Sequence, residues 1–110
     1  SAKIESLGSI SPELKKIENY YIASINTLIS SLEETEENKE LFDGYFEKLS
    51  ELTADYKVLT KELNTEGLNE KTINALIENL QLRLKLLYQL KEQLNELKNL
   101  NKLENENIHI

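Results

Sequence analysis

Apolar residues recur at intervals of three and four along most of this chain, a spacing that places side chains on one face of an α-helix. The pattern predicts three amphipathic helices over about residues 12–33, 38–63 and 70–103. We therefore expect an all-α fold, namely an antiparallel three-helix bundle with a long third helix and short connections. Residues 1–11 lack a helical period and are expected to form a linker or a cloning scar, and residues 104–110 a polar tail.

Turn and capping residues support two of the predicted boundaries. Ser11 can accept hydrogen bonds from the first amides of a helix, and Pro12 loses no hydrogen bond at a first helical position. Gly67 suits the left-handed conformation that follows a helix end, and Asn69 can cap the next helix. Residues 30–35 hold neither Gly nor Pro, so the boundary between the first and second helices is defined only to within several residues.

The second predicted helix has the most regular seam, because its core-facing residues alternate steps of three and four without exception. The seam residues are Phe42, Tyr45, Leu49, Leu52, Tyr56, Leu59 and Leu63. Aromatic residues at such spacing are expected to pack in the core with their hydroxyl groups at its rim. Tyr20 and Phe46 lie beside the apolar stripes, and we expect them to be exposed aromatic residues instead.

The third predicted helix is the longest and most apolar, with a stripe that covers well over a third of its circumference. At about 1.5 Å per residue it would extend on the order of 50 Å, so the other helices would cover its beginning and leave its last turns bare. Burying a Leu side chain is worth roughly 1.5–3 kcal/mol, and bare leucines would therefore favour a homodimer or a partner helix. The candidate interaction surface consists of Leu86, Leu90, Leu94, Leu97 and Leu100.

Composition and charge narrow the class of protein. With 110 residues the chain has room for one domain, which the pattern places at residues 12–103. The net charge of −7 opposes binding to nucleic acid phosphates and to an anionic membrane surface, so we expect neither partner. No stretch approaches about 18 consecutive apolar residues, which argues against direct membrane contact by these residues.

Residues that could perform chemistry are sparse. His109 is the only His and lies in the predicted polar tail, where nothing can orient a base or hold a metal ion. The chain has no Cys, which removes thiolate ligands. The acidic run within residues 33–37 lacks the Gly-containing spacing of a calcium loop and is better explained as a solvated connection. We therefore expect no enzymatic activity, no catalytic residue, no metal site and no cofactor.

Arg83 is the only Arg and interrupts the apolar run of the third predicted helix. Its side chain could extend to the edge of the apolar face and keep the charged group in water. Alternatively, it could pair with an acidic residue of a neighbouring helix and set the register of the bundle. The sequence favours the first explanation and leaves the second open.

Several segments carry a resemblance to a known group of proteins: residues 73–87, 90–94 and 98–107, together with Ser11-Pro12-Glu13, Tyr20-Tyr21-Ile22 and Ile25-Asn26. They are similar to the C-terminal, extracytoplasmic region of single-pass membrane proteins of Bacteroidetes that are described as anti-sigma factors. The resemblance spans about residues 7–107.

The resemblance implies a longer protein. A short cytoplasmic segment that binds a sigma factor and one transmembrane helix would precede this domain, which would lie in the periplasm, tethered to the inner membrane. The chain opens with Ser1-Ala2-Lys3 and holds no Met, so we expect it to be truncated.

Two functional hypotheses follow. The first is the extracytoplasmic domain of a membrane-anchored anti-sigma factor, which regulates transcription by binding a protein partner or itself through the third helix. The second is a cytoplasmic adaptor or secretion chaperone, in which the wide face of the third helix receives an amphipathic helix of a client.

Overall fold

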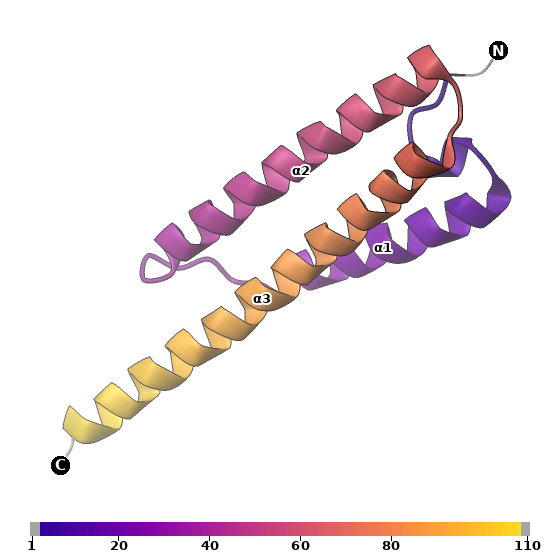
Figure 1. The fold of residues 1–110 in the computed structure, drawn as a ribbon. Helices are drawn as coiled ribbons and strands as arrows, with labels where there is room; N and C mark the ends of the chain where they lie inside the picture. Colours follow the sequence, from indigo (N-terminus) through magenta and orange to yellow (C-terminus); the bar gives the residue numbers. More distant parts are fainter. Residues whose placement is uncertain (1–2, 109–110) are drawn as a thin grey trace.

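The fold is an elongated bundle of three helices that run in alternating directions (Figure 1). A computed structural model describes residues 3–108 and places the helices at Pro12–Ser30 (α1), Lys39–Glu66 (α2) and Glu70–Ile108 (α3). A short 3₁₀ turn, η1, precedes them at Leu7–Ser9, and the described residues contain no strand. The molecule measures 70 × 22 × 19 Å. The predicted all-α fold with a long third helix is confirmed.

The helix boundaries follow the capping chemistry that the sequence indicates. The hydroxyl oxygen of Ser11 accepts a hydrogen bond from the Leu14 N–H at 3.1 Å at the beginning of α1. Gly67 ends α2 with a φ of 91°, a conformation that favours Gly. The Asn69 side chain then accepts from the Thr72 N–H at 2.8 Å and caps α3. These three predicted signals are confirmed.

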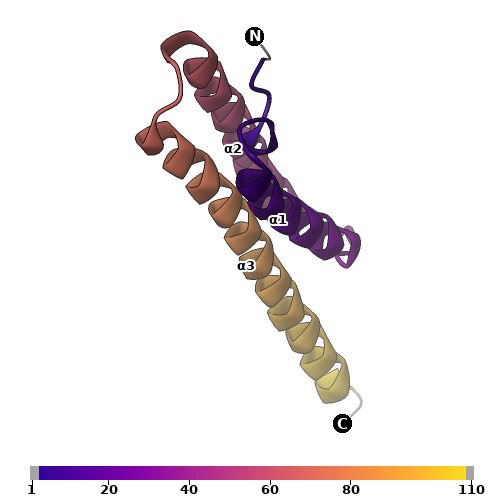
Figure 2. The ribbon, with the colours of Figure 1, turned by 90° about the vertical axis from the view of Figure 1, so that its right-hand side faces the viewer.

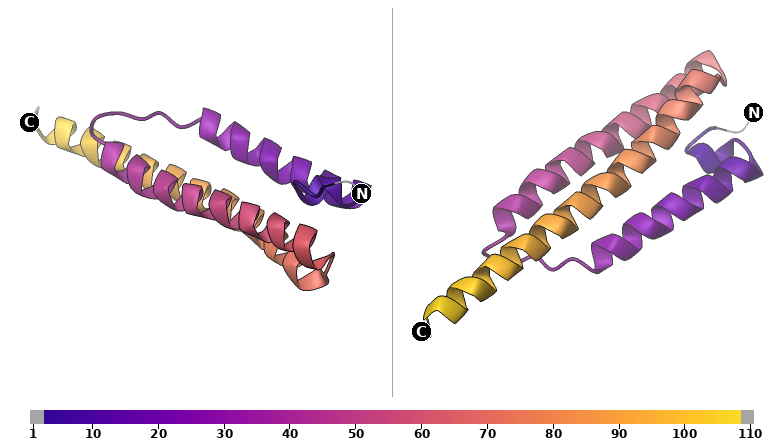
Figure 3. Two further views of the ribbon diagram at one scale, coloured as in Figure 1. Left: turned by 90° about the horizontal axis from the view of Figure 1, so that it is seen from above. Right: turned by 60° about the horizontal axis from the view of Figure 1, so that its bottom comes forward.

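Helix α3 lies between the other two helices and packs against both of them. Figure 3 shows α1 and α2 on different sides of α3. Two apolar clusters fill the interior. The first contains the buried residues Leu7, Leu63, Leu76 and Leu80, and the second contains Ile25, Leu28, Leu49 and Leu87. The second cluster draws on all three helices, so it holds the middle of the bundle together.

The N-terminal segment is part of the core, and the predicted linker over residues 1–11 is wrong for the described part of that range. Leu7 has an exposed fraction of 0% and belongs to the first apolar cluster, against which Ile4 and Ile10 also pack. Figure 2 shows this segment at the end of the bundle, beside the beginning of α1 and the end of α2. The prediction failed because three apolar residues spaced by three are too few to show a helical period.

Two predicted helix ends also differ from the structure. Helix α1 ends at Ser30 rather than near residue 33, and the hydroxyl groups of Ser30 and Ser31 donate to main-chain carbonyl oxygens one turn earlier. Helix α3 continues to Ile108, so the predicted polar tail is helical over residues 104–108. That segment holds no Gly or Pro, and its two Glu residues favour helix. His109 lies outside the described residues.

The connection between α1 and α2 is an extended segment rather than a short turn, and Asn38 organises it. The Asn38 side-chain oxygen accepts from the Thr35 N–H at 2.7 Å, and its nitrogen donates to the Glu33 carbonyl oxygen at 3.0 Å. The Thr35 hydroxyl oxygen accepts from the Asn38 N–H at 3.3 Å. These bonds and the burial of Asn38 fix the path of residues 31–38, which we call the α1–α2 loop.

One buried polar side chain interrupts the interface between α2 and α3. The Asn79 nitrogen donates to the Leu52 carbonyl oxygen at 2.8 Å, whereas its side-chain oxygen is buried without a hydrogen-bond partner. A buried acceptor without a partner destabilises a fold by about 1–3 kcal/mol, which outweighs the roughly 1 kcal/mol that one hydrogen bond contributes. Asn79 therefore lowers the free energy of unfolding. A buried polar residue of this kind can specify the register between two helices at such a cost.

Replacing Asn79 with Leu is expected to raise the free energy of unfolding by about 1 kcal/mol, because the unpartnered oxygen is removed at similar side-chain volume. Urea unfolding followed by circular dichroism measures the change. Asn74→Leu, at an exposed position of the same helix, is the matched control and should stay within about 0.5 kcal/mol of the parent chain. A loss of stability in Asn79→Leu alone would contradict the expectation.

Candidate interaction surface

The five leucines predicted as an interaction surface do not share one exposed face. Leu90 has an exposed fraction of 0%, so its assignment to a surface is wrong, and Leu86 packs against the second apolar cluster. Leu94 and Leu97 are half-buried. Leu100 alone among the five is exposed, at 57%. The apolar face of α3 that the sequence predicts to be bare is therefore mostly covered by other residues of this chain.

The cover over Leu94 and Leu97 comes from the α1–α2 loop. This loop and α3 enclose a cleft of about 340 Å³ that both leucines line together with Leu32. Lys91 and Lys98 also line the cleft, and Asn101 closes its far end by donating to the Glu37 carboxylate at 2.8 Å. Because the loop is extended, α2 begins beside the C-terminal half of α3. The length of α3 alone therefore overestimates how much of its apolar face is bare.

Only the last turns of α3 project from the bundle. In Figure 1 the C-terminal part of α3 extends past the beginning of α2. Among the side chains described at this end, Leu100 and Leu103 are the exposed apolar ones. Two leucines form a small patch, far from the several hundred Å² that mark a stable interface.

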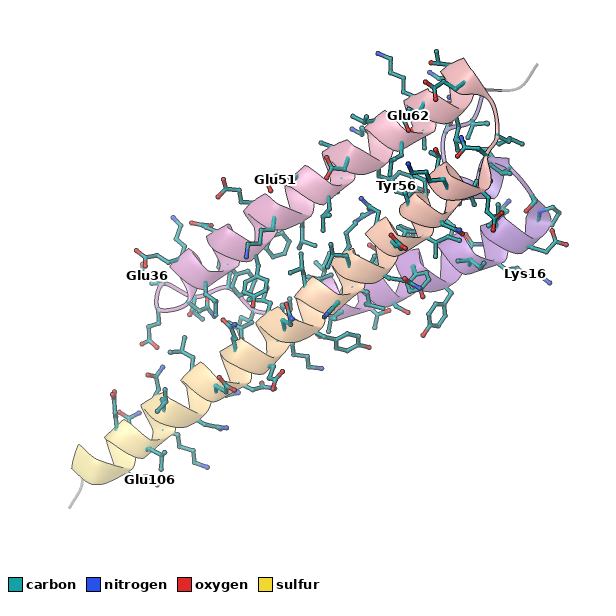
Figure 4. All side chains as sticks on the ribbon, in the orientation of Figure 1. Lys16, Glu36, Glu51, Tyr56, Glu62 and Glu106 are labelled. Atoms are coloured by element: carbon teal, nitrogen blue, oxygen red, sulfur yellow. The ribbon has the colours of Figure 1, made fainter. Side chains whose placement is uncertain are left out.

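A second surface, along α1, is distinguished by what it lacks. Residues 19–32 contain no Asp, Glu, Lys or Arg, although 30% of the chain is charged. Several of these residues are exposed, including Tyr20, Ala23, Asn26 and Thr27. The exposed faces of soluble helices normally carry charges, as Glu51 and Glu62 of α2 do in Figure 4. An exposed helical face without charges is typical of the centre of a protein interface.

Tyrosine side chains adjoin this charge-free face. Tyr20 is 64% exposed and packs edge-on against Tyr21, with ring centroids 5.2 Å apart. The Tyr21 hydroxyl oxygen accepts from the Gln81 side chain at 3.1 Å. Tyr88 of α3 is 57% exposed and lines a groove of about 380 Å³ between the two helices, together with Tyr21 and Leu84, and Lys85 and Glu92 line its α3 side. We call this surface the α1–α3 groove.

The α1–α3 groove continues toward the α1–α2 loop. A second hollow of about 380 Å³ shares Tyr88 with the groove and is lined on α1 by Ala23, Ser24, Thr27, Leu28 and Ser31. Lys91 and Ser31 then border both this hollow and the cleft beneath the loop. The small side chains of α1 permit close approach of another helix along this shallow surface.

The prediction of exposed aromatic residues is confirmed for Tyr20 but not for Phe46. Phe46 is half-buried, stacks on Phe42 with ring centroids 5.8 Å apart and packs against the second apolar cluster. Tyr88 was missed, because it lies in a leucine-rich run that indicates core. The absence of charge over residues 19–32 is visible in the sequence and could have identified the surface.

A polar cluster links all three helices at the other end of the bundle. Tyr56 projects from α2 into the bundle (Figure 4), and its hydroxyl oxygen accepts from the Leu7 N–H at 3.0 Å near the Glu18 carboxylate of α1. Burial lowers the pKa of the half-buried Arg83, an effect that the nearby Tyr56 partly offsets. Arg83 is thus half-buried in the neighbourhood of Tyr56.

Burial is the largest cause of a raised pKa at Tyr56, and the Glu18 carboxylate adds to it. The hydrogen bond from Leu7 and the charge of Arg83 act in the opposite direction without cancelling the rise. Because the pKa is higher in the folded protein than its ordinary value of 10.0, the neutral hydroxyl contributes stability that is complete below about pH 10 and is lost as the pH rises through the raised pKa.

We expect Tyr56→Phe to reduce the fall in unfolding free energy between about pH 9 and pH 11, because the variant has no hydroxyl group to ionise at this position. At neutral pH the same variant should be less stable by about 1 kcal/mol, through loss of the hydrogen bond from the Leu7 N–H. Urea unfolding at a series of pH values measures both effects. Tyr88→Phe is the exposed control, and an identical pH dependence in the two variants would contradict the role of Tyr56.

Other sites for chemistry do not emerge from the described part of the chain. Residues 3–108 contain no group of three or more His, Asp or Glu side chains that could hold a metal ion. None of the described helices is long and apolar enough to cross a membrane. No family model matches this chain, and no curated protein or solved structure matches it significantly.

Proposed function

We propose that this chain is a non-catalytic protein-binding domain whose α1–α3 groove receives a helix of a partner protein. The observation that carries the proposal is the charge-free, exposed face of α1 at residues 19–32, in a chain with a net charge of −7. Removing charges from water is costly, so a helix face that is buried in a complex benefits from having none.

The tyrosines support the same use of the groove. Tyr side chains supply large contact areas and a hydrogen-bonding group, and they are enriched among the residues that dominate binding energy. Tyr88 is exposed and lines the groove from α3, and the exposed Tyr20 packs edge-on against Tyr21, which lines the groove from α1. An incoming helix that packs in the groove would contact α1 and α3 together. Such a partner helix would still bind through α3, as the sequence predicts, but at the face of α3 that carries Tyr88.

Two arms test the groove. A photo-reactive phenylalanine replaces Tyr20 or Tyr88 in the producing cells, and the same residue replaces Val58, which is 60% exposed on α2, as the matched control. We expect both groove positions to crosslink to one and the same protein and the control position not to do so. Tyr88→Lys should abolish the crosslink from position 20 while circular dichroism stays unchanged. Equal crosslinking from all three positions would contradict the proposal.

For the biological setting, we propose the extracytoplasmic domain of a membrane-anchored anti-sigma factor, located in the periplasm and tethered to the inner membrane. The resemblance of residues 73–87 and 90–94 to such proteins supports this proposal. A shift in helix packing on partner binding would then pass a signal toward the cytoplasmic segment. The gene tests this setting separately, since it should encode about 20 consecutive apolar residues upstream of Ser1, beside a sigma-factor gene.

A cytoplasmic adaptor or secretion chaperone is the alternative, and the cleft beneath the α1–α2 loop favours it. Leu32, Leu94 and Leu97 offer apolar contacts there, next to the charged groups of Lys91 and Lys98. A client helix with an apolar stripe and a polar edge would match this lining. Copurification with one client, together with a gene that begins at this domain, would favour the alternative over the membrane-anchored setting.

A further inference from the structure

The N-terminal segment at residues 4–10 is held by side chains of α1 and α2, and we call it the N-terminal clasp. Its first contact is with Asn64 near the end of α2. The Asn64 side-chain oxygen accepts from the Ile4 N–H at 2.8 Å, and the side-chain nitrogen donates to the Ile4 carbonyl oxygen at 2.7 Å. One amide side chain thus satisfies both main-chain groups of Ile4, much as a neighbouring strand would.

Two more side chains bind the main chain of the clasp. The Tyr56 hydroxyl oxygen accepts from the Leu7 N–H at 3.0 Å, and the Glu18 carboxylate accepts from the Gly8 N–H at 2.8 Å. A Cβ atom at Gly8 would lie 3.2 Å from the other Glu18 carboxylate oxygen and 3.3 Å from the Lys15 side chain. Gly8 therefore permits an approach that other residues would hinder.

A single apolar pocket completes the site. The Leu7 side chain is fully buried among Leu63 of α2 and Leu76 and Leu80 of α3. Main-chain hydrogen bonds combined with one deep side-chain pocket are a means by which proteins bind short peptide segments. The helices reach each other without the clasp, because the second apolar cluster in the middle of the bundle contains residues of α1, α2 and α3 only.

We propose that this end of the bundle is a peptide-binding groove for a short segment that forms a 3₁₀ turn at a Leu-Gly pair, and that the chain's own residues 4–10 occupy it. The clasp opens as a unit while the three helices stay packed, and it can be replaced by the same segment added as a separate peptide. The proposal is independent of the α1–α3 groove, since it uses other residues at Asn64, Tyr56 and Glu18.

Hydrogen exchange of the full chain, measured by NMR at a series of low urea concentrations, tests the opening. We expect the Leu7 and Gly8 amides to be protected, yet to exchange at least about tenfold faster than the Leu87 amide and with less dependence on urea. Tyr56→Phe should accelerate exchange at Leu7 by roughly five- to tenfold and leave Leu87 unchanged. Exchange of Leu7 and Leu87 at one rate with one urea dependence would overturn the proposal, as would an unprotected Leu7 amide.

Peptide binding tests the groove. A fluorescent peptide with the sequence of residues 3–11 is titrated into the full-length Leu7→Ala chain and into the parent chain, and anisotropy reports binding. We expect binding to the Leu7→Ala chain at least about tenfold tighter than to the parent chain, whose own clasp competes. A peptide that itself carries Leu7→Ala should bind at least about tenfold more weakly.

The remaining outcomes of the titration are also decisive. Equal binding of the two peptides would show that the Leu pocket does not select the ligand, and this would overturn the proposal. Loss of helical circular dichroism in the Leu7→Ala chain would show that the clasp cannot separate from the bundle, with the same consequence. Hydrogen exchange of the parent chain decides the question of opening without any core substitution.

Discussion

Leu7→Ala is expected to lower the free energy of unfolding by about 2–5 kcal/mol, which is the range for truncating a fully buried Leu. The side chain has an exposed fraction of 0% and contacts the first apolar cluster, so its removal leaves a cavity as well as less buried apolar area. The cavity lies where the clasp meets α2 and α3. Helicity at 25 °C should persist, because the second cluster does not include the clasp.

Urea unfolding of the parent and variant chains measures this effect. Leu68→Ala is the matched control, because Leu68 is an exposed Leu near the same end of the bundle and should change stability by no more than about 0.5 kcal/mol. Similar small losses in the two variants would mean that residues 4–10 do not form part of the core. A large loss in Leu7→Ala alone would establish that the domain begins before Pro12.

The helices themselves could be predicted from local signals. The α2 seam predicts its own inward face, and the structure buries Phe42, Leu49 and Leu63 as expected. Ser11 and Gly67 act at the helix ends where capping chemistry places them. Each of these signals lies within one helix or one turn, and such local patterns need no knowledge of the tertiary fold.

The parts that were missed depend on contacts between distant segments. Leu7 is buried because Tyr56 and Asn64, far along the chain, provide hydrogen bonds for the clasp. Leu94 and Leu97 are half-buried because Asn38 shapes a loop that passes over them. Neither arrangement leaves a periodic signal, since both depend on side-chain to main-chain bonds, which are long-range for the clasp and local for the α1–α2 loop.

The candidate interaction surface illustrates a different limit. Apolar periodicity identifies residues that need cover, but it does not distinguish cover by the same chain from cover by a partner. The absence of charged residues on an exposed face is more informative than apolar periodicity here, because packing in the core of this chain does not explain why exposed residues lack charge. Residues 19–32 show this absence, and Tyr88 lies opposite them across the groove.

A comparison of Leu90 with Leu100 separates these two kinds of cover. Leu90→Ala is expected to lower the free energy of unfolding by about 2–5 kcal/mol, because the side chain is fully buried against the rest of the bundle. Leu100 is a Leu of the same helix but is 57% exposed. Leu100→Ala should therefore change the free energy of unfolding by no more than about 0.5 kcal/mol. Urea unfolding at several protein concentrations measures both.

The dependence on concentration decides how α3 is covered. If this chain alone covers Leu90, the unfolding midpoint of the parent chain and the loss in Leu90→Ala should not vary with protein concentration. If a second copy provided the cover, as the leucine pattern of α3 alone suggested, the midpoint would rise with concentration and Leu100→Ala would weaken that rise. A midpoint that rises with concentration would support self-association at the C-terminal end of α3, as the sequence predicts. A midpoint independent of concentration would argue against self-association there, and the α1–α3 groove would then be the surface available to partners.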